Sequence, residues 1–522
     1  MAVRHSRGDM AHAKEHGAKK KTGVEEKERV DVSATSKKKR ERWKWTAWVL
    51  AAAVLVRLVV GLHPHSGQGT PPKFGDYEAQ RHWMEITVHT PTKDWYRETE
   101  NNPMEHWGLD YPPLSAYQSW LCGKAIQLVE PEAVELVASR GYESQSSKAY
   151  MRWSAVLSDA LFLFPGALAC IGTLYKRRRL EQRLWALASV LLQPALLLID
   201  HGHFQYNGIS LGLAAGAAAA ILNNRTFLGA VLFSLSLNHK QMSLYYAPAF
   251  FFHLVGSSLQ KKNPLLHLSG LALVVFYTFL GCWLPWITAD YSFLHVLKRI
   301  FPFERGLYED YVANFWCTTS LLVKWKKLFT GKELRSFCFM ATFVAMLPSC
   351  LHQLWKPSRK GLLYAMANTS LSFFMFSFQV HEKSILLPLL PVALLVLDQT
   401  VCAEWLAYVS AFSMYPLLER DKLGVAYLAT LVMYWCVMRM GKTKATRGRG
   451  PISTALGSHS RTFFTFSVCI ALGLHAAYAL APTLPRYPFL YQALITAYSF
   501  VHLVAILMEL TACQMQLGGS DA

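Results

Sequence analysis

Long apolar runs, separated by short polar or charged connections, dominate the pattern of this chain. The first run covers residues 45–62 and follows a polar stretch of 44 residues, and the last run covers 489–510. A helix of about 20 apolar residues crosses the hydrocarbon core of a bilayer, so each run predicts a membrane-spanning helix. Since about fourteen such runs can be placed, the pattern predicts an all-α polytopic membrane protein.

Clusters of Lys and Arg mark the connections that we expect on the cytosolic side. One cluster precedes the first span, and further clusters occupy residues 176–179, 356–360 and 442–449. Cytosolic connections of membrane proteins carry an excess of these residues. The alternation of spans then places both chain termini in the cytosol and the remaining connections on the opposite side.

Two of the connections on that opposite side are long enough to carry a function. We predict a cytosolic tail at residues 1–44, a membrane domain at 45–511 and a short cytosolic C-terminal tail at 512–522. The two outer loops lie within the membrane domain, at 63–150 and 287–336. Within the first loop, an acidic stretch at 130–143 resembles a helix. Within the second, the apolar residues 317–323 are too few to span and are expected to lie along the membrane.

Composition supports a membrane protein, because 52% of the residues are hydrophobic and only 17% are charged. These values exclude a largely disordered chain, a coiled coil and a small disulfide-linked secreted domain. The net charge of +19 reflects basic residues beside the spans, so we expect contact with a lipid bilayer and none with nucleic acid. The ten cysteines form no C-x-x-C pair and are expected in the core rather than at a metal.

Candidate chemistry lies in three polar segments that the alternation places on one side. In the first, Asp76 and Glu78 are two residues apart, so on a helix they diverge and only one can face a reacting centre. The alternative is that Asp76 caps a helix and Glu78 pairs with Arg81 at the surface.

The second segment, 200–207, contains His201 and His203, which would not share a face of a helix. A metal site is therefore disfavoured, and we expect a turn that contacts substrate or a hydrogen-bonded loop. In the third segment, His381 and Lys383 are suitable donors to a phosphate oxygen, and Glu382 could orient either one. The alternative is a group of interfacial charges that reach toward water.

Together these segments resemble the endoplasmic-reticulum, dolichyl-phosphate-glucose-dependent α-1,3-glucosyltransferases of N-glycan precursor assembly. The resemblance extends over residues 45–510 and is closest to the members that add the first glucose, with the sister enzymes that add the second as the alternative. It is carried by the residues 75–83 (GDYEAQRHW), 109–114 (LDYPPL), 200–207 (DHGHFQYN), 301–317 (FPFERGLYEDYVANFWC) and 378–383 (FQVHEK).

The resemblance implies a GT-C fold, a lumenal active site and an inverting transfer that needs neither metal nor cofactor. The substrates would be dolichyl phosphate glucose as donor and dolichyl-pyrophosphate-linked oligomannose as acceptor. A membrane transporter is a remote alternative, but its polar groups would lie at the bilayer midplane rather than at span ends.

By motif match, the resemblance also implies roles for individual residues. Asp76 would be the catalytic base, and His381, Lys383 and Arg305 would bind the donor phosphate. A phosphate leaving group is weakly basic, so it needs cationic donors rather than a general acid. The remaining candidates for contact with either substrate are Glu78, Glu382, Glu309, Asp310, His201, His203 and Gln205.

Overall fold

The computed structural model describes residues 40–289, 293–301, 306–308, 310–441, 460–482 and 484–518. The chain divides into two compact units, residues 1–52 and 53–522, and the boundary falls within the helix Arg40–Gly61. Regular structure in the described residues is helical, and β pairing there is limited to three isolated bridges. This confirms the predicted all-α fold.

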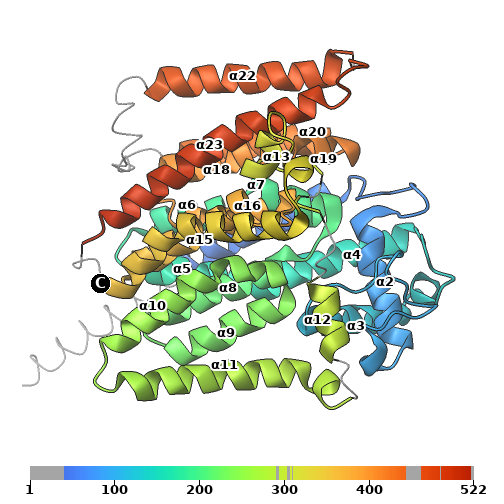
Figure 1. Ribbon diagram of the computed structural model, residues 1–522, viewed down its shortest axis with the longest axis horizontal. Coiled ribbons are helices and arrows are strands. Elements are labelled where there is room, and N and C mark those ends of the chain that lie inside the picture. Colours follow the sequence, from blue (N-terminus) through green and yellow to red (C-terminus); the bar gives the residue numbers. More distant parts are fainter. Residues whose placement is uncertain are drawn as a thin grey trace, which may run out of the picture. The chain divides into compact units, whose positions relative to one another are not determined.

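The second unit begins with the end of the helix Arg40–Gly61, and the helices of the predicted first outer loop and a bundle of apolar helices follow (Figure 1). Its α-helices are α2 (Gly75–His89), α3 (Pro113–Gln127), α4 (Gln145–Ser158), α5 (Phe164–Leu174), α6 (Leu180–Leu191), α7 (Pro194–Leu197), α8 (Asn207–Leu222), α9 (Thr226–His239), α10 (Ala247–Leu259), α11 (Pro264–Ile287), α12 (Phe293–Ile300), α13 (Phe315–Thr319), α14 (Trp325–Leu328), α15 (Gly331–Trp355), α16 (Arg359–Phe376), α17 (Leu386–Leu394), α18 (Thr400–Ser413), α19 (Tyr415–Arg420), α20 (Gly424–Gly441), α22 (Ser460–Leu480) and α23 (Leu490–Met515).

Short 3-10 and π-helical turns connect or extend several of these helices. The π-helical turns are η3 (Asp159–Leu163) and η4 (Leu198–Phe204), and the 3-10 turns are η1 (Thr92–Asp94), η2 (Pro131–Val134), η5 (Gln241–Tyr246) and η6 (Glu382–Ile385).

Six of the described helices are long and apolar enough to cross a membrane, or seven if the pair Leu180–Leu191 and Pro194–Phe204, bent by 44°, forms one span. Further apolar helices, such as α8 and α9, are shorter. Helix α8 is buried along nearly its whole length, because α5 and α9 pack against it. The length of a helix that is enclosed by other helices need not match the thickness of the bilayer, so length alone does not decide whether α8 or α9 crosses it. The number of fourteen spans therefore stays a prediction.

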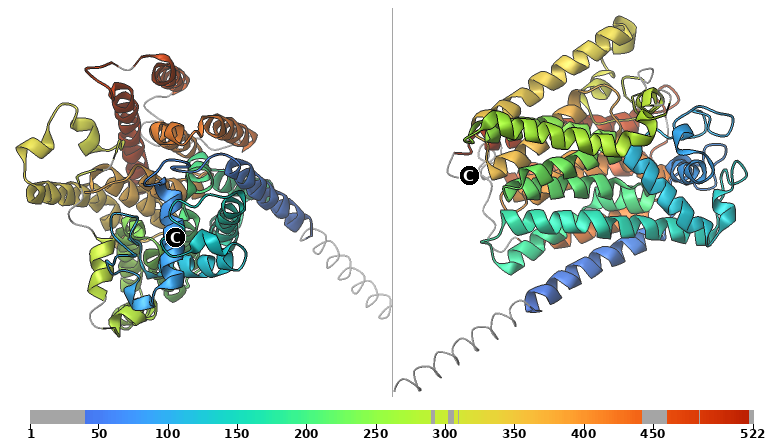
Figure 2. Two further views of the ribbon diagram at one scale, coloured as in Figure 1. Left: turned by 90° about the vertical axis from the view of Figure 1, so that its right-hand side faces the viewer. Right: turned by 90° about the horizontal axis from the view of Figure 1, so that it is seen from below.

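The helices α2 and α3 lie beside each other at one end of the bundle (Figures 1 and 2). Tyr77, Met84 and Ile126 from these helices share a buried cluster with Met151 of α4 and Phe204 of η4. This apolar contact attaches the predicted first outer loop to the segment that contains His201 and His203.

The prediction of a helix at 130–143 is wrong. The structure has only the turn η2 there, followed by further turns. Val137 has a φ of 67° and Gly141 a φ of 72°, and both values lie in the left-handed region, which ends a right-handed helix. A Cβ on Gly141 would lie 2.4 Å from the ring of Phe74, so close packing against the start of α2 also favours glycine here.

Polar contacts in the described residues join connections that the sequence predicts on the same side of the membrane. Connections expected on the outer side contact one another, as in the hydrogen bond from Gln379 N to Leu307 O and the ion pair of Arg420 with Asp310. Connections expected on the inner side do the same, since Asp398 bonds both Tyr175 and Lys360. The short helices α13 and α14 lie within the predicted second outer loop, whose boundaries stay a prediction.

Candidate active site

A cluster of charged side chains surrounds Asp76, the second residue of α2. Its Oδ2 atom accepts a hydrogen bond from Lys383 Nζ at 2.7 Å and lies 3.2 Å from His203 Nε2. Gln205 Nε2 also donates to Oδ2. The side chain of Asp76 keeps 20% of its surface exposed, so a substrate can reach it. The structure thus brings together residues from all three polar segments.

The start of α2 directs Asp76 toward this cluster. Phe74 and Gly75 both have positive φ values, 53° and 65°, and they turn the chain sharply into the helix. A Cβ on Gly75 would lie 2.5 Å from Ser66 Oγ, so glycine permits the close approach that lets Asp76 N donate to Ser66 Oγ. Ser66 N in turn donates to His203 O at 3.0 Å. These bonds hold the carboxylate beside His203.

Lys383 and His203 are themselves in contact and are largely buried. Lys383 belongs to η6, between α16 and α17, and its Nζ lies 3.1 Å from His203 Nε2. On the other side of the ring, His203 Nδ1 bonds Asp421 Oδ2, and Asp421 follows α19 directly. The imidazole therefore lies between two carboxylates from distant parts of the chain.

The charge on Asp76 is controlled by these neighbours. Burial disfavours the carboxylate, but the Lys383 ammonium and the His203 ring outweigh it and hold the pKa of Asp76 well below its usual value. Asp76 is therefore ionised at neutral pH and available to accept a proton. The same ion pair weakens its basicity, so displacement of Lys383 would make Asp76 a stronger base.

A second layer of polar groups fixes the orientation of Gln205. Lys240 Nζ donates to Gln205 Oε1 at 2.8 Å, and Tyr111 OH lies 3.4 Å from the same oxygen. Lys240 Nζ also lies 4.7 Å from the centre of the Tyr111 ring. With its oxygen thus engaged, Gln205 turns its amide nitrogen toward Asp76.

Glu78 points away from Asp76, as the two-residue spacing predicts. It is buried, and its two carboxylate oxygens accept from Arg81 at 2.6 and 2.7 Å. Arg81 also donates to Glu85 Oε2 at 2.7 Å. The expected alternative for Glu78, a pair with Arg81, is present, but it is buried rather than at the surface.

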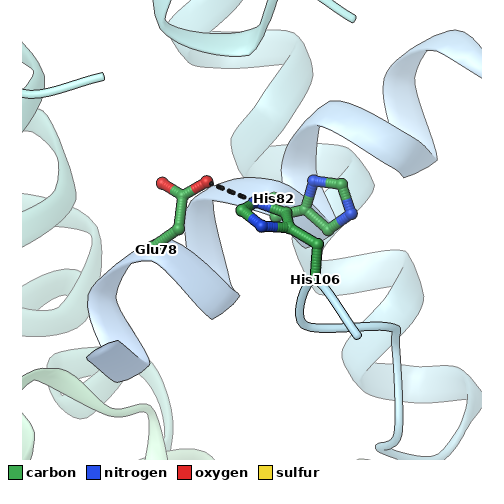
Figure 3. Close-up of side chains that lie close together, drawn as sticks. All are labelled: Glu78, His82 and His106. Carbon is green, nitrogen blue, oxygen red and sulfur yellow. Dashed lines mark hydrogen bonds and ion pairs between the residues drawn. The ribbon is translucent and has the colours of Figure 1, made fainter. Parts of the chain in front are cut away.

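Glu78, His82 and His106 bring together three potential metal ligands. One ligand atom from each lies within 4.8 Å of the others, and Figure 3 shows Glu78 and His82 on α2 with His106 on a separate loop beside them. However, both Glu78 oxygens already accept from the Arg81 guanidinium. A cation would have to displace Arg81, so we interpret the group as a network of ion pairs and hydrogen bonds.

This network predicts a large effect of Arg81 on stability. Burial disfavours the charge on Glu85, but His82 and Arg81 outweigh it and lower the pKa of Glu85 to about 2. Arg81→Ala would leave two buried carboxylates without their cation, which typically costs about 3–5 kcal/mol. We expect a clearly lower midpoint of thermal unfolding for the purified protein, followed by tryptophan fluorescence.

The matched control for Arg81 is Arg97→Ala. Arg97 pairs with Asp94 at 3.0 Å in the same loop, but its side chain is 41% exposed, and exposed pairs contribute little. An unfolding midpoint for Arg81→Ala as high as that for Arg97→Ala would contradict a stabilising role of the buried network.

The structure does not bring every candidate residue to Asp76. His201 Nε2 bonds Asp159 Oδ2 at 3.0 Å, and Asp159 is paired with Arg57 in the interior of the bundle. Asp310 pairs with Arg420 at an exposed position. The two histidines thus diverge, as their spacing predicts.

The remaining candidates are close to η6 or outside the described residues. His381 immediately precedes η6 and is half-buried, and Glu382 is buried within it. Arg305 and Glu309 lie outside the described residues.

Sequence reasoning missed Asp421, Lys240 and Tyr111 as parts of this site. Two signals were present, because Arg420-Asp421-Lys422 is a charged run between apolar helices, and the segment 238–240 ends in a lysine. The predicted alternation places both segments on the same side as Asp76. What was missing was any indication that these connections meet.

The sequence profile of the ALG6, ALG8 glycosyltransferase family matches residues 53–509. The chain belongs to this family. The predicted family and enzyme class are thereby confirmed: the protein is a polytopic membrane glycosyltransferase with the GT-C fold.

Curated relatives of this glycosyltransferase carry names that agree with the family. A protein of Arabidopsis thaliana, named "Probable dolichyl pyrophosphate Man9GlcNAc2 alpha-1,3-glucosyltransferase", is 47% identical over 463 residues, which cover 87% of this chain and 86% of the relative. A Dictyostelium discoideum protein of the same name is 41% identical over a match that covers 87% of this chain and 92% of the relative. The Gallus gallus "Dolichyl pyrophosphate Man9GlcNAc2 alpha-1,3-glucosyltransferase" is 38% identical over a match that covers 90% of this chain and 96% of the relative.

Proposed function

We propose that this protein transfers glucose from dolichyl phosphate glucose to the dolichyl-pyrophosphate-linked oligomannose precursor of N-glycans, in α-1,3 linkage and with inversion. The observation that carries this proposal is the exposed edge of Asp76 beside Lys383, at the end of the bundle where predicted outer connections meet. The names of the relatives support the acceptor and the linkage.

The chemistry of an inverting transfer fits this arrangement. The acceptor hydroxyl attacks the anomeric carbon of glucose, and Asp76 removes its proton as general base. The bond from that carbon to the phosphate oxygen breaks, and dolichyl phosphate leaves with the electron pair. Lys383 and His381 stabilise the charge on the phosphate as it departs. No general acid is needed, in contrast to glycoside hydrolysis, where a poor leaving group requires a second carboxyl.

Lys383 links donor binding to the basicity of Asp76. In the structure its ammonium bonds the carboxylate. A donor phosphate is an alternative anionic partner for the same ammonium, and its binding would draw Lys383 away from Asp76. The base therefore gains strength only when the donor is in place, which limits reaction in its absence.

We further propose that the acceptor is the unglucosylated oligomannose, because the relatives' names specify Man9GlcNAc2. The protein would reside in the endoplasmic-reticulum membrane, with the site and the loops 63–150 and 287–336 in the lumen. The membrane domain 45–511 would be flanked by cytosolic tails, 1–44 and 512–522. The basic clusters beside the spans support this orientation.

Transfer by the purified protein tests the proposed function. The donors would be dolichyl phosphate glucose or dolichyl phosphate mannose, and the acceptors unglucosylated or monoglucosylated lipid-linked oligomannose. We expect product only with the glucose donor and the unglucosylated acceptor, at a rate that excess EDTA leaves unchanged. Product only from the monoglucosylated acceptor would assign the protein to the sister activity, and product only from the mannose donor would overturn the donor assignment.

A further inference from the structure

The imidazole of His203 connects two carboxylates that the sequence separates by 345 positions, Asp76 and Asp421. His203 Nε2 lies 3.2 Å from Asp76 Oδ2, and Nδ1 bonds Asp421 Oδ2. His203 and Asp421 are both buried, whereas Asp76 keeps an exposed edge. His203 therefore joins the partly exposed carboxylate of Asp76 to the buried carboxylate of Asp421.

The partners of the ring indicate where its protons lie. A carboxylate can only accept, so Nδ1 beside Asp421 carries a hydrogen. Nε2 lies between Asp76 Oδ2 at 3.2 Å, which can only accept, and the Lys383 ammonium at 3.1 Å, which can only donate, so these two neighbours decide whether Nε2 carries a hydrogen. When the ring is neutral, Asp421 therefore holds it in the tautomer that can accept a proton at Nε2.

We propose that Asp76, His203 and Asp421 form a proton relay, in which His203 takes up the proton that Asp76 removes from the acceptor hydroxyl and Asp421 positions the ring. This inference rests on the proposed function. His203 acts through Asp76, and Asp421 acts through His203, so both are positioning residues rather than groups that touch substrate.

In one turnover, a single proton enters the relay from the acceptor hydroxyl and leaves it again. When the donor phosphate engages Lys383, Nε2 loses its ammonium partner and faces Asp76. The proton of the acceptor hydroxyl passes to Asp76 and then to Nε2, while the glycosidic bond forms and dolichyl phosphate leaves. The resulting imidazolium lies between two carboxylates, which stabilise its charge. It returns the proton to Asp76, which releases it to water at its exposed edge, and the neutral ring is restored.

Two further titratable groups, Arg152 and His65, lie near the His203 ring and would affect its titration. Arg152 of α4 donates to Gly202 O at 2.8 Å and lies over the ring of Phe204. His65 lies in the turn whose Ser66 N bonds His203 O. Neither group contacts the imidazole nitrogens in the described structure, whose bonds go to Asp421, Lys383 and Asp76.

The pH dependence of kcat/KM in Asp421→Asn tests the relay. We expect kcat at the optimum to fall by about 10- to 100-fold, with the donor KM nearly unchanged because Lys383 and His381 remain. The acidic limb of the profile should move to lower pH, because a ring without its carboxylate neighbour binds a proton less tightly. Asp421→Glu, which retains the carboxylate, should restore the position of this limb.

Asp398→Asn is the matched control, because Asp398 is a half-buried carboxylate that bonds Lys360 and Tyr175 at the other end of the bundle. It should leave the acidic limb in place. An Asp421→Asn profile with lower kcat but an unshifted limb would show a merely structural role and overturn the relay.

A second variant keeps the test decisive if Asp421→Asn unfolds. His203→Gln keeps a hydrogen-bonding side chain that cannot take up a proton, so we expect it to lose at least as much kcat. A folded His203→Gln enzyme within about threefold of the wild type would overturn the relay, because a proton-transfer group typically contributes far more. In either case the wild type would still transfer glucose, whereas failure of the proposed function would abolish transfer in the wild type itself.

Discussion

Asp76→Asn is expected to lower kcat for glucosyl transfer by about 10²- to 10⁴-fold, the usual contribution of a positioned general base. Asparagine keeps the shape of the side chain but cannot take the proton from the acceptor hydroxyl. Because Lys383 and His381 remain, both lipid substrates should still bind. Single-turnover transfer with saturating donor and acceptor measures this effect separately from binding.

Glu78→Gln is the matched comparison, since Glu78 lies on the same helix but faces Arg81 and His106. We expect it to lower stability while the folded fraction keeps most of its activity. The opposite outcome, an active Asp76→Asn enzyme and an inactive but folded Glu78→Gln enzyme, would assign the base to Glu78. If both stayed active, the base would have to be sought among Asp110, Glu309 and Asp310.

The second large effect is expected for Lys383→Ala. Removal of one charged hydrogen bond to the donor phosphate costs about 2 kcal/mol, which corresponds to a roughly 30-fold lower kcat/KM. The donor KM should rise and kcat should fall, because Lys383 stabilises the leaving phosphate more strongly than the bound one. Steady-state kinetics with varied dolichyl phosphate glucose measures both parameters.

Loss of Lys383 also removes a cation from Asp76, so the pKa of Asp76 should rise toward its ordinary value. The group would still be ionised at neutral pH, so this change alone does not inactivate the enzyme. Lys124→Ala, in the predicted lumenal loop that also contains Asp76 but at an exposed position, should leave the donor KM unchanged. Equal donor kinetics for Lys383→Ala and Lys124→Ala would refute the phosphate-binding role.

Half of the site could be predicted from the sequence for one physical reason. Apolar length and basic connections predict on which side each connection lies, and this prediction places Asp76, His203, Gln205 and Lys383 on one side. The divergence of Asp76 from Glu78 also follows from helical geometry alone. These features depend on local pattern, which a single sequence contains.

The remaining features depend on tertiary contacts that local pattern does not contain. Asp421 reads as an ordinary charge between two helices until α19 is placed beside η4, where it bonds His203. Lys240 likewise gains its role only by reaching Gln205. The predicted helix at 130–143 failed because Gly141 must pass close to Phe74, a contact between residues 67 positions apart.

The most direct test of the proposed mechanism, in which Lys383 binds the donor phosphate and frees Asp76 to act as the base, is a structure of the protein with dolichyl phosphate glucose bound. The proposed mechanism predicts that a phosphate oxygen lies about 3 Å from Lys383 Nζ, that Lys383 has left Asp76, and that the freed carboxylate faces the glucose from the side opposite the phosphate. A donor whose phosphate binds away from the connection between α16 and α17, with Lys383 still paired to Asp76, would contradict it.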